Sequence, residues 1–156
     1  MQRSKTAVTL LLIAMGMMFA SLTSAMFVRR GLGGDWQALP LPWIALWNVL
    51  ILAASSAALE LARRRNSRPM WAVACVLGAI FVGMQGLVWR DLAMAGFSAA
   101  TNPSSSFFYL LSGLHGVHVI GGIAALLATR AVAATWYWHG MSALWAYLMI
   151  LFRWME

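Results

Sequence analysis

Long runs without an Asp, Glu, Lys or Arg residue divide this chain of 156 residues. The runs cover residues 6–28, 36–59, 69–89, 92–129 and 131–152. About 20 residues of α-helix cross a hydrocarbon layer of roughly 30 Å, so every run is long enough for a membrane span. Moreover, 62% of the residues are apolar and 10% are charged, and a soluble domain of this size could not bury so much apolar surface. The sequence therefore predicts an integral membrane protein.

The fourth run is too long for one helix, and it contains Gly96 and the turn-forming pair Asn102 and Pro103. We therefore place a helix after this pair. A transmembrane β-barrel is not expected, because no run alternates apolar and polar residues with a period of two. The predicted fold class is all-α: residues 1–156 form a single membrane domain, a bundle of five transmembrane helices. The predicted helices cover about residues 6–29, 39–62, 69–90, 104–129 and 133–154.

Basic residues at the ends of the predicted helices indicate the orientation of the bundle. With the N-terminus in the cytoplasm, seven Lys and Arg residues lie on the inside and four on the outside. The cluster within residues 63–68 supplies most of this difference, and cytoplasmic segments of membrane proteins carry the excess of basic residues. We therefore expect a cytoplasmic N-terminus and a periplasmic C-terminus. Nucleic acid is not an expected partner, because no soluble segment is large enough to form a basic binding surface.

Ionisable side chains inside a membrane are costly and usually mark function. Glu60 is followed three and four positions later by arginines, which predicts a local ion pair near the membrane surface. His115 and His118 lie three positions apart on the fourth predicted helix, and His139 lies near the start of the fifth. A haem with two axial histidines needs ligands from facing helices at one depth, which these positions do not supply. We expect these histidines to form hydrogen bonds between helices and not to bind haem or metal.

Four short motifs occur in order along the last four predicted helices. Their residues, helix by helix, are Asn48, Ser55 and Ser56; Gln85 and Trp89; Phe107, Phe108, Gly113, His115, Gly116 and His118; and Trp136, Tyr137, Trp138, His139 and Trp145. They are similar to the signatures NTxxLLxSS, FLxxQxxEW, FF…TGFHGLHV and WYWHFVDxxW of subunit III of the haem–copper oxidases. The chain thus resembles this family over four helices, with the motifs in family order and at family spacing.

The resemblance implies the short five-helix bacterial form of subunit III. Such a chain is an accessory subunit of a terminal oxidase that reduces O₂ to water and pumps protons, and it lies in the bacterial inner membrane. It packs directly against catalytic subunit I and is assembled with other oxidase subunits. A respiratory supercomplex is a candidate for a larger assembly that contains this oxidase. Haem and copper belong to subunit I, and subunit II is a further candidate for copper. No catalytic residue, cofactor or metal is therefore expected in this chain itself.

The same resemblance implies phospholipid in a cleft between the helices. We expect the first helix to stand partly apart from the others and leave this cleft. Basic residues near the inner face are the candidates for contacts with lipid headgroups, because lipid phosphates attract cations there. These candidates are Arg63, Arg64, Arg68 and Arg130.

The sequence departs from the family pattern at its acidic positions. The family has a Ser–Glu pair where this chain has Ala14 and Met15, a glutamate at Val88 and an aspartate at Ser142. Gly140 also stands where the family has an aromatic residue. Because these carboxylates are replaced, we expect a role as scaffold and interface rather than in proton chemistry.

Two alternative functions remain open from the sequence. One is a subunit III homologue associated with nitric oxide reductase, in which the same fold serves another catalytic partner; co-purifying haem proteins would distinguish it. The other is a small haem-b membrane anchor that uses His115, His118 or His139. An optical spectrum of the isolated chain would identify that anchor by its haem absorption.

Overall fold

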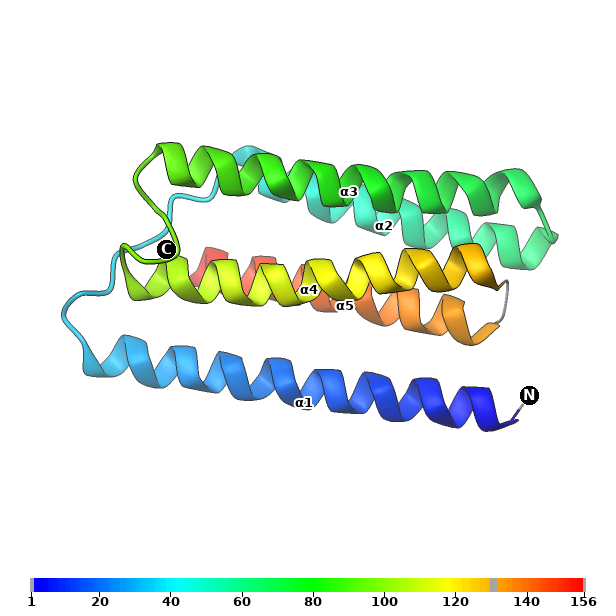
Figure 1. Ribbon diagram of the computed structural model, residues 1–156, viewed down its shortest axis with the longest axis horizontal. Helices are drawn as coiled ribbons and strands as arrows, with labels where there is room; N and C mark the ends of the chain where they lie inside the picture. Colours follow the sequence, from blue (N-terminus) through cyan, green and yellow to red (C-terminus); the bar gives the residue numbers. More distant parts are fainter. Residues whose placement is uncertain (1, 130–131, 156) are drawn as a thin grey trace.

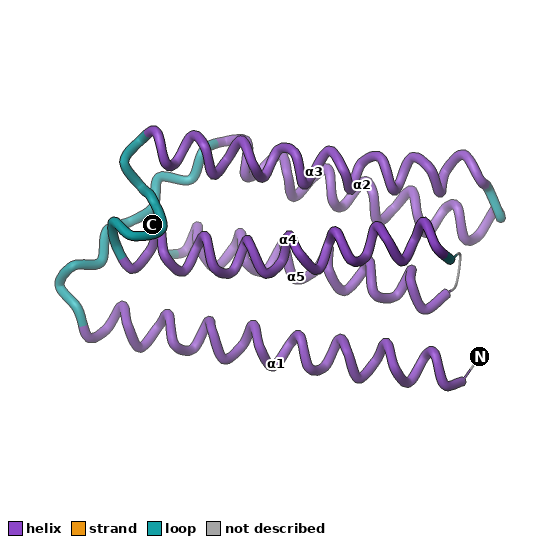
Figure 2. Tube along the Cα trace, in the orientation of Figure 1, coloured by secondary structure: helices purple, strands orange, loops and turns teal. Residues whose placement is uncertain are grey.

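The computed structural model describes residues 2–129 and 132–155, which form five helices that run side by side (Figure 1). No β-strand occurs in this described part, so the predicted all-α bundle is confirmed there (Figure 2). The helices are α1 (Gln2–Leu32), α2 (Trp43–Arg65), α3 (Arg68–Met94), α4 (Pro103–Ala128) and α5 (Val132–Trp154).

The helix ends follow from local sequence signals. Pro42 precedes α2 in an extended conformation, as its fixed φ and missing amide hydrogen favour at a helix start. Asn66 ends α2 in the left-handed region (φ 48°), and the amide of Ser67 donates to the Ala62 carbonyl at 2.9 Å. The Asn102 side chain caps α4 by accepting from the Ser105 amide at 3.0 Å. Short, defined connections of this kind hold neighbouring helices antiparallel.

Helices α2 to α5 form a closed ring, and α1 lies outside it. Within the ring α2 and α4 each contact α3 and α5, whereas α1 contacts α4 and α5 (Figure 1). Met15, Phe19, Thr23 and Met26 are the α1 side chains buried against this face in the described part of the chain. With five helices, the N-terminal and C-terminal ends of the chain lie at opposite ends of the bundle.

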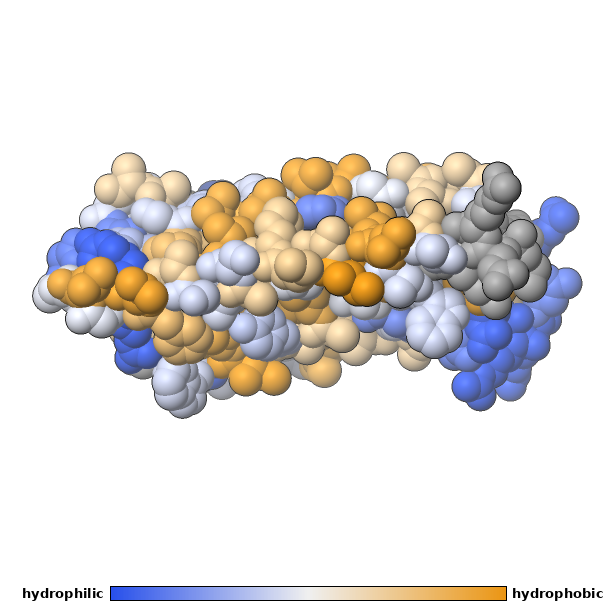
Figure 3. Space-filling model, turned by 90° about the horizontal axis from the view of Figure 1, so that it is seen from below, coloured by the Kyte–Doolittle hydropathy of each residue, from blue (hydrophilic) through white to orange (hydrophobic). Residues whose placement is uncertain are grey.

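Four of the described helices are long and apolar enough to cross a membrane: Thr6–Leu32 within α1, and α2, α3 and α4. Helix α5 has the same length as α2 but carries aromatic and polar residues along its first half. It contacts three other helices, so many of its side chains face protein and need not be apolar. In Figure 3 hydrophilic residues gather mainly at the two ends and apolar residues cover the middle, as lipid requires.

Large aromatic side chains fill the core of the ring. Trp138 is fully buried, and two glycines on neighbouring helices make room for its indole ring. A Cβ atom at Gly78 of α3 would lie 2.6 Å from that ring, and one at Gly122 of α4 would lie 3.1 Å from it. These contacts fix how α5 is rotated against α3 and α4, because the indole fits only where both glycines face it.

Candidate functional site

A buried serine joins three of the helices that carry the motifs. Ser55 of α2 donates to the Ala74 carbonyl of α3 at 2.7 Å. The same hydroxyl accepts from the indole Nε1 of Trp138 on α5 at 3.1 Å. Ser55, Ala74 and Trp138 are all fully buried, and a buried polar group without a hydrogen bond costs about 1–3 kcal/mol. Ser55 therefore holds α2, α3 and α5 in one register.

Asn48 and Gln85 form a second buried link between α2 and α3. The Asn48 Nδ2 donates to the Gln85 Oε1 at 3.1 Å. The Asn48 Oδ1 and the Gln85 Nε2 have no hydrogen-bond partner within the described residues. Only two of the four polar side-chain atoms of the pair are thus bonded, and this single hydrogen bond links two apolar helices.

Indole side chains connect α3 to α4 at both ends. Trp89 Nε1 donates to the Ser112 hydroxyl at 2.9 Å, and the Tyr109 hydroxyl donates to the Trp89 carbonyl at 2.8 Å. At the other end Trp71 Nε1 donates to the Leu126 carbonyl at 3.0 Å. These bonds prevent α4 from sliding along α3.

His115 of α4 lies inside an aromatic cluster. Its ring stacks on Trp145 of α5 with centroids 4.9 Å apart, and meets the Phe81 ring of α3 edge-on at 5.7 Å. Phe81 and Trp145 also meet edge-on at 5.0 Å. His115 is fully buried, and neither ring nitrogen has a hydrogen-bond partner in the described chain. The expected interhelical hydrogen bond of His115 is therefore wrong: its ring packs as an aromatic.

His118 faces another part of the molecule. Its Nδ1 lies 2.6 Å from the Leu114 carbonyl of its own helix, and its ring lies 6.3 Å from the Phe19 ring of α1. The Tyr137 hydroxyl of α5 donates to the His118 carbonyl at 3.0 Å. Although His115 and His118 are three residues apart, one points to α3 and α5 and the other towards α1. The structure does not bring them together into one site.

His139 joins a polar cluster on the outside of the seam between α2 and α5. Its Nδ1 makes a hydrogen bond with the Ser56 hydroxyl, and its Nε2 lies 3.7 Å from the Glu60 carboxylate. Glu60 in turn accepts from Arg63 at 2.6 Å and from Arg64 at 2.7 Å, which confirms the predicted ion pair. We call these five residues the Glu60–His139 cluster.

Sequence reasoning missed the link between His139 and Glu60. The two residues are far apart in the chain, and each has an ordinary local explanation. Only the side-by-side packing of α2 and α5 brings the imidazole to the carboxylate. A search for ionisable residues at equal distance from the same end of two helices could have suggested it.

The remaining motif residues lie at the margins of the core. Phe108 is buried and meets the Phe152 ring edge-on at 5.2 Å, while Phe107, Gly113 and Gly116 are half-buried. Trp136 is 67% exposed beside α1. Of the lipid candidates, Arg63, Arg64 and Arg68 are exposed at the α2–α3 end, and Arg130 lies outside the described residues.

Packing fills the positions at which the expected family pattern has acidic or aromatic residues. Met15 and Val88 are buried in the core. Ser142 donates to the Trp138 carbonyl of its own helix at 3.0 Å. Gly140 lets α1 approach α5, because a Cβ atom there would lie 2.7 Å from the Leu12 side chain. These sites now serve helix packing and local hydrogen bonding.

Chemically, the arrangement contains two different centres. The interior consists of indoles, phenyl rings and neutral polar groups that hold four helices in register. The Glu60–His139 cluster, by contrast, places three charged side chains of α2 and an imidazole of α5 on the outer surface of the bundle. The first centre suits a rigid framework and the second suits contact with another molecule.

Comparisons with known proteins give a consistent set of relatives. The chain is 29% identical over 155 residues to a "Probable cytochrome c oxidase subunit 3" of Nocardia farcinica, covering 83% of this chain and 76% of that protein. It is 29% identical over 169 residues to the "Cytochrome c oxidase subunit 3" of Thermostichus vulcanus, covering 90% and 81%. The wheat (Triticum aestivum) protein of that name is 29% identical over 150 residues, covering 79% and 56%. No family model matches the chain.

Proposed function

We infer that this chain, which belongs to the cytochrome c oxidase subunit 3 family, is an accessory subunit of a haem–copper oxidase. It is a multi-pass protein of the bacterial inner membrane. Membership of the family also makes it part of an oxidase complex with other subunits. The observation that carries the inference is that relatives of this name match the chain over most of its length. The motif residues of four helices, which converge on one buried framework, agree with it.

The framework suits a subunit that braces a catalytic partner. Ser55 ties α2, α3 and α5 together, and the stack of His115, Trp145 and Phe81 fills the space between α3, α4 and α5. Side chains with few accessible rotamers keep the outer surface of the bundle in a fixed shape. Such a surface loses little conformational entropy when a partner docks on it, which stabilises the complex.

We propose subunit I as the direct partner and as the holder of the haem and copper, with subunit II as a further candidate for copper. This chain then contributes surface and rigidity, and its own residues hold no cofactor. A respiratory supercomplex remains a candidate assembly.

The orientation with a cytoplasmic N-terminus is part of the same proposal. The turn between α2 and α3 lies at the same end of the bundle as the N-terminus (Figure 1). This turn is flanked by Arg63, Arg64, Arg65 and Arg68. Such a concentration of arginine at one end supports a cytoplasmic location for it.

Phospholipid binding is proposed for the same end. A hollow of about 230 Å³ lies between α1 and α5, and Val8, Leu12 and Trp136 are among its walls. It supports a cleft beside α1 that could take an acyl chain. Exposed guanidinium groups such as that of Arg68 supply positive charge for lipid phosphates at this end.

Purification in a mild detergent tests the function. A tagged chain should co-purify with a haem-bearing subunit that mass spectrometry identifies as a cytochrome oxidase subunit I, and the preparation should reduce O₂. Co-purification with nitric oxide reductase subunits would contradict the oxidase assignment. A b-type absorption band that stays with the isolated chain would instead support a haem-b anchor.

A further inference from the structure

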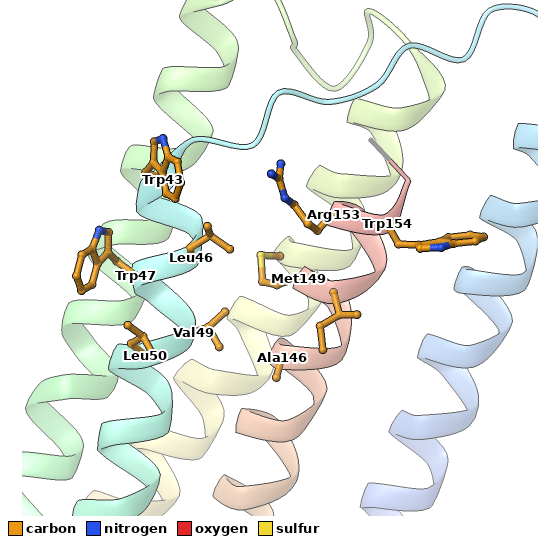
Figure 4. A pocket seen from close by; sticks show the side chains of 10 residues that line it. Trp43, Leu46, Trp47, Val49, Leu50, Ala146, Met149, Arg153 and Trp154 are labelled. Atoms are coloured by element: carbon orange, nitrogen blue, oxygen red, sulfur yellow. The ribbon is translucent and has the colours of Figure 1, made fainter.

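Two hollows lie one after the other along the outer seam between α2 and α5, and we call them together the α2–α5 groove. Its first part is a hollow of about 720 Å³ with Trp47 and Leu50 of α2 on one side and Ala146 and Ile150 of α5 on the other (Figure 4). Its second part is a hollow of about 450 Å³ that contains Ser56 and the Glu60–His139 contact. One helical turn separates the two hollows on each helix, so they follow one another along the same seam.

The walls of the groove change character along its length. At the end near the C-terminus, large apolar side chains line the groove, and one of them, Trp47, is 59% exposed. Further along, the lining residues are small: Ala53, Ala57, Ser142 and Ala143. Small side chains let the backbone of another helix approach closely, which is the main source of helix association in lipid.

The Glu60–His139 cluster supplies the second, independent observation. Glu60 lies five residues from the end of α2 and His139 seven residues from the start of α5, or about 8–10 Å in from that end of the bundle. Exposed ionisable groups on a helix surface that faces lipid are costly unless they are paired. Two guanidinium groups share one carboxylate, so the cluster has a positive charge left over. A protein partner with an acidic side chain at this level complements it.

The exposed surface of α4 lacks this combination. Leu110, Val117 and Ile120 are exposed there, and they are apolar side chains of the kind that lipid covers. Helix α4 contacts α3, α5 and α1 but not α2, so its outer surface looks away from the groove. The two surfaces of one bundle therefore suit different neighbours.

We propose that the α2–α5 groove is the surface on which a transmembrane helix of the haem-bearing catalytic subunit docks, with an acidic side chain of that helix facing Arg63 and Arg64. This inference rests on the proposed function, since it takes the partner from there. The apolar half of the groove packs against bulky side chains of the docked helix, and the small residues of the other half let its backbone come close.

Site-specific photo-cross-linking in the intact complex tests the proposal. Ala57 and Ile150, both in the groove and both exposed, are each replaced by p-benzoylphenylalanine. Ile120 and Leu110 of α4 provide matched controls at similar depths on the other surface. After illumination in membranes, mass spectrometry identifies what each position has captured. We expect both groove positions to capture the haem-bearing subunit, at least fivefold more than either control.

The other outcomes overturn the proposal. Capture of lipid alone from the groove, or equal or greater capture of the catalytic subunit from α4, would contradict it. These results differ from a failure of the proposed function, because they are obtained with a complex in which the oxidase subunit has co-purified. If no oxidase subunit co-purifies at all, the proposed function itself fails. A charge-removing variant, Arg63→Gln, should also reduce the yield of the complex while α-helix content stays unchanged, because it removes a positive charge that faces the acidic side chain.

Discussion

The two histidine-containing regions of this molecule differ in almost every physical respect. His115 is fully buried among aromatic rings and makes no hydrogen bond within the described chain. His139 lies partly exposed on the outer seam, with Ser56 and Glu60 as partners. The imidazole of His115 has no hydrogen bond and fits its site by shape, whereas the imidazole of His139 lies beside a hydroxyl and a carboxylate. The contrast separates residues that shape the bundle from residues that suit a neighbouring molecule.

The largest expected effect lies in the buried core, at Trp138. Trp138→Ala removes a buried indole and its hydrogen bond to Ser55, and should lower the free energy of unfolding by about 3–5 kcal/mol. Thermal unfolding in detergent micelles measures the change. Trp136→Ala is the matched control, because that indole is mostly exposed, and it should change stability by less than about 1 kcal/mol. Equal losses for both variants would show that burial does not distinguish the two positions.

An overpacked core should produce the next largest effect. In Gly78→Ala the new methyl group would lie 2.6 Å from the Trp138 ring, so helix or indole must shift, at a cost of about 1–3 kcal/mol. Gly83→Ala on the same helix meets no atom within 4 Å and serves as the control. Its unfolding midpoint should stay the same or rise, since alanine favours helix over glycine. If Gly78→Ala is as stable as the unchanged protein, the space that Gly78 leaves for the Trp138 ring does not set the position of α5.

Replacement by phenylalanine should have different effects at the two histidines, His115 and His139. His115→Phe replaces two unpartnered buried nitrogen atoms by carbon in a ring of similar size, and should leave stability unchanged or raise it by about 1 kcal/mol. His139→Phe instead removes the partner of Ser56 and Glu60, and should weaken the association with the catalytic subunit. Differential scanning fluorimetry and the yield of the purified complex measure these effects. A marked loss of stability for His115→Phe would show that its nitrogen atoms have a hidden role.

The smallest expected effect concerns an exposed ion pair between the last turn of α1 and the connection to α2. Arg29 donates to the Asp35 carboxylate at 2.6 Å, and this hydrogen bond lowers the pKa of Asp35 below its ordinary value of 3.8. The carboxylate is therefore favoured in the folded protein. The contribution of the pair to stability is present above pH 3.8 and is lost as the pH falls through the lowered pKa.

An NMR titration of the Asp35 carboxyl carbon in detergent micelles measures this pKa directly. In Arg29→Gln it should rise towards the ordinary value, while the unfolding midpoint at neutral pH changes little, because exposed pairs contribute little to stability. An unchanged pKa in the variant would mean that the pair does not form in solution.

Local signals in the sequence predicted the helices and their chemistry. Charge-free runs predict the membrane-spanning helices, because a segment in lipid must satisfy its own backbone hydrogen bonds and an α-helix does so. Gly96, Asn102 and Pro103 mark the break between α3 and α4, where Gly96 adopts a φ of 87°. The ion pair of Glu60 with Arg63 was also predictable, because its partners are three residues apart on one helix.

Other features depend on how the helices are rotated against one another. Ser55 and Trp138 are 83 residues apart, and nothing near either residue in the sequence shows that they meet. His115 was expected to form a hydrogen bond, yet its neighbours turned out to be Phe81 and Trp145. Periodicity shows which residues share a face of one helix, but not which neighbouring helix that face meets.

By itself, the sequence determined that this protein is a bundle of long apolar helices with a cluster of arginines within residues 63–68 at one end. Those properties belong to single segments and to their transfer into lipid. The tertiary structure alone decided that Glu60 meets His139, that His115 is sealed among aromatic rings, and that a groove opens between α2 and α5. The physical reason is that helix rotation is set by the close packing of a few large rings against glycine, which is a property of all the helices together.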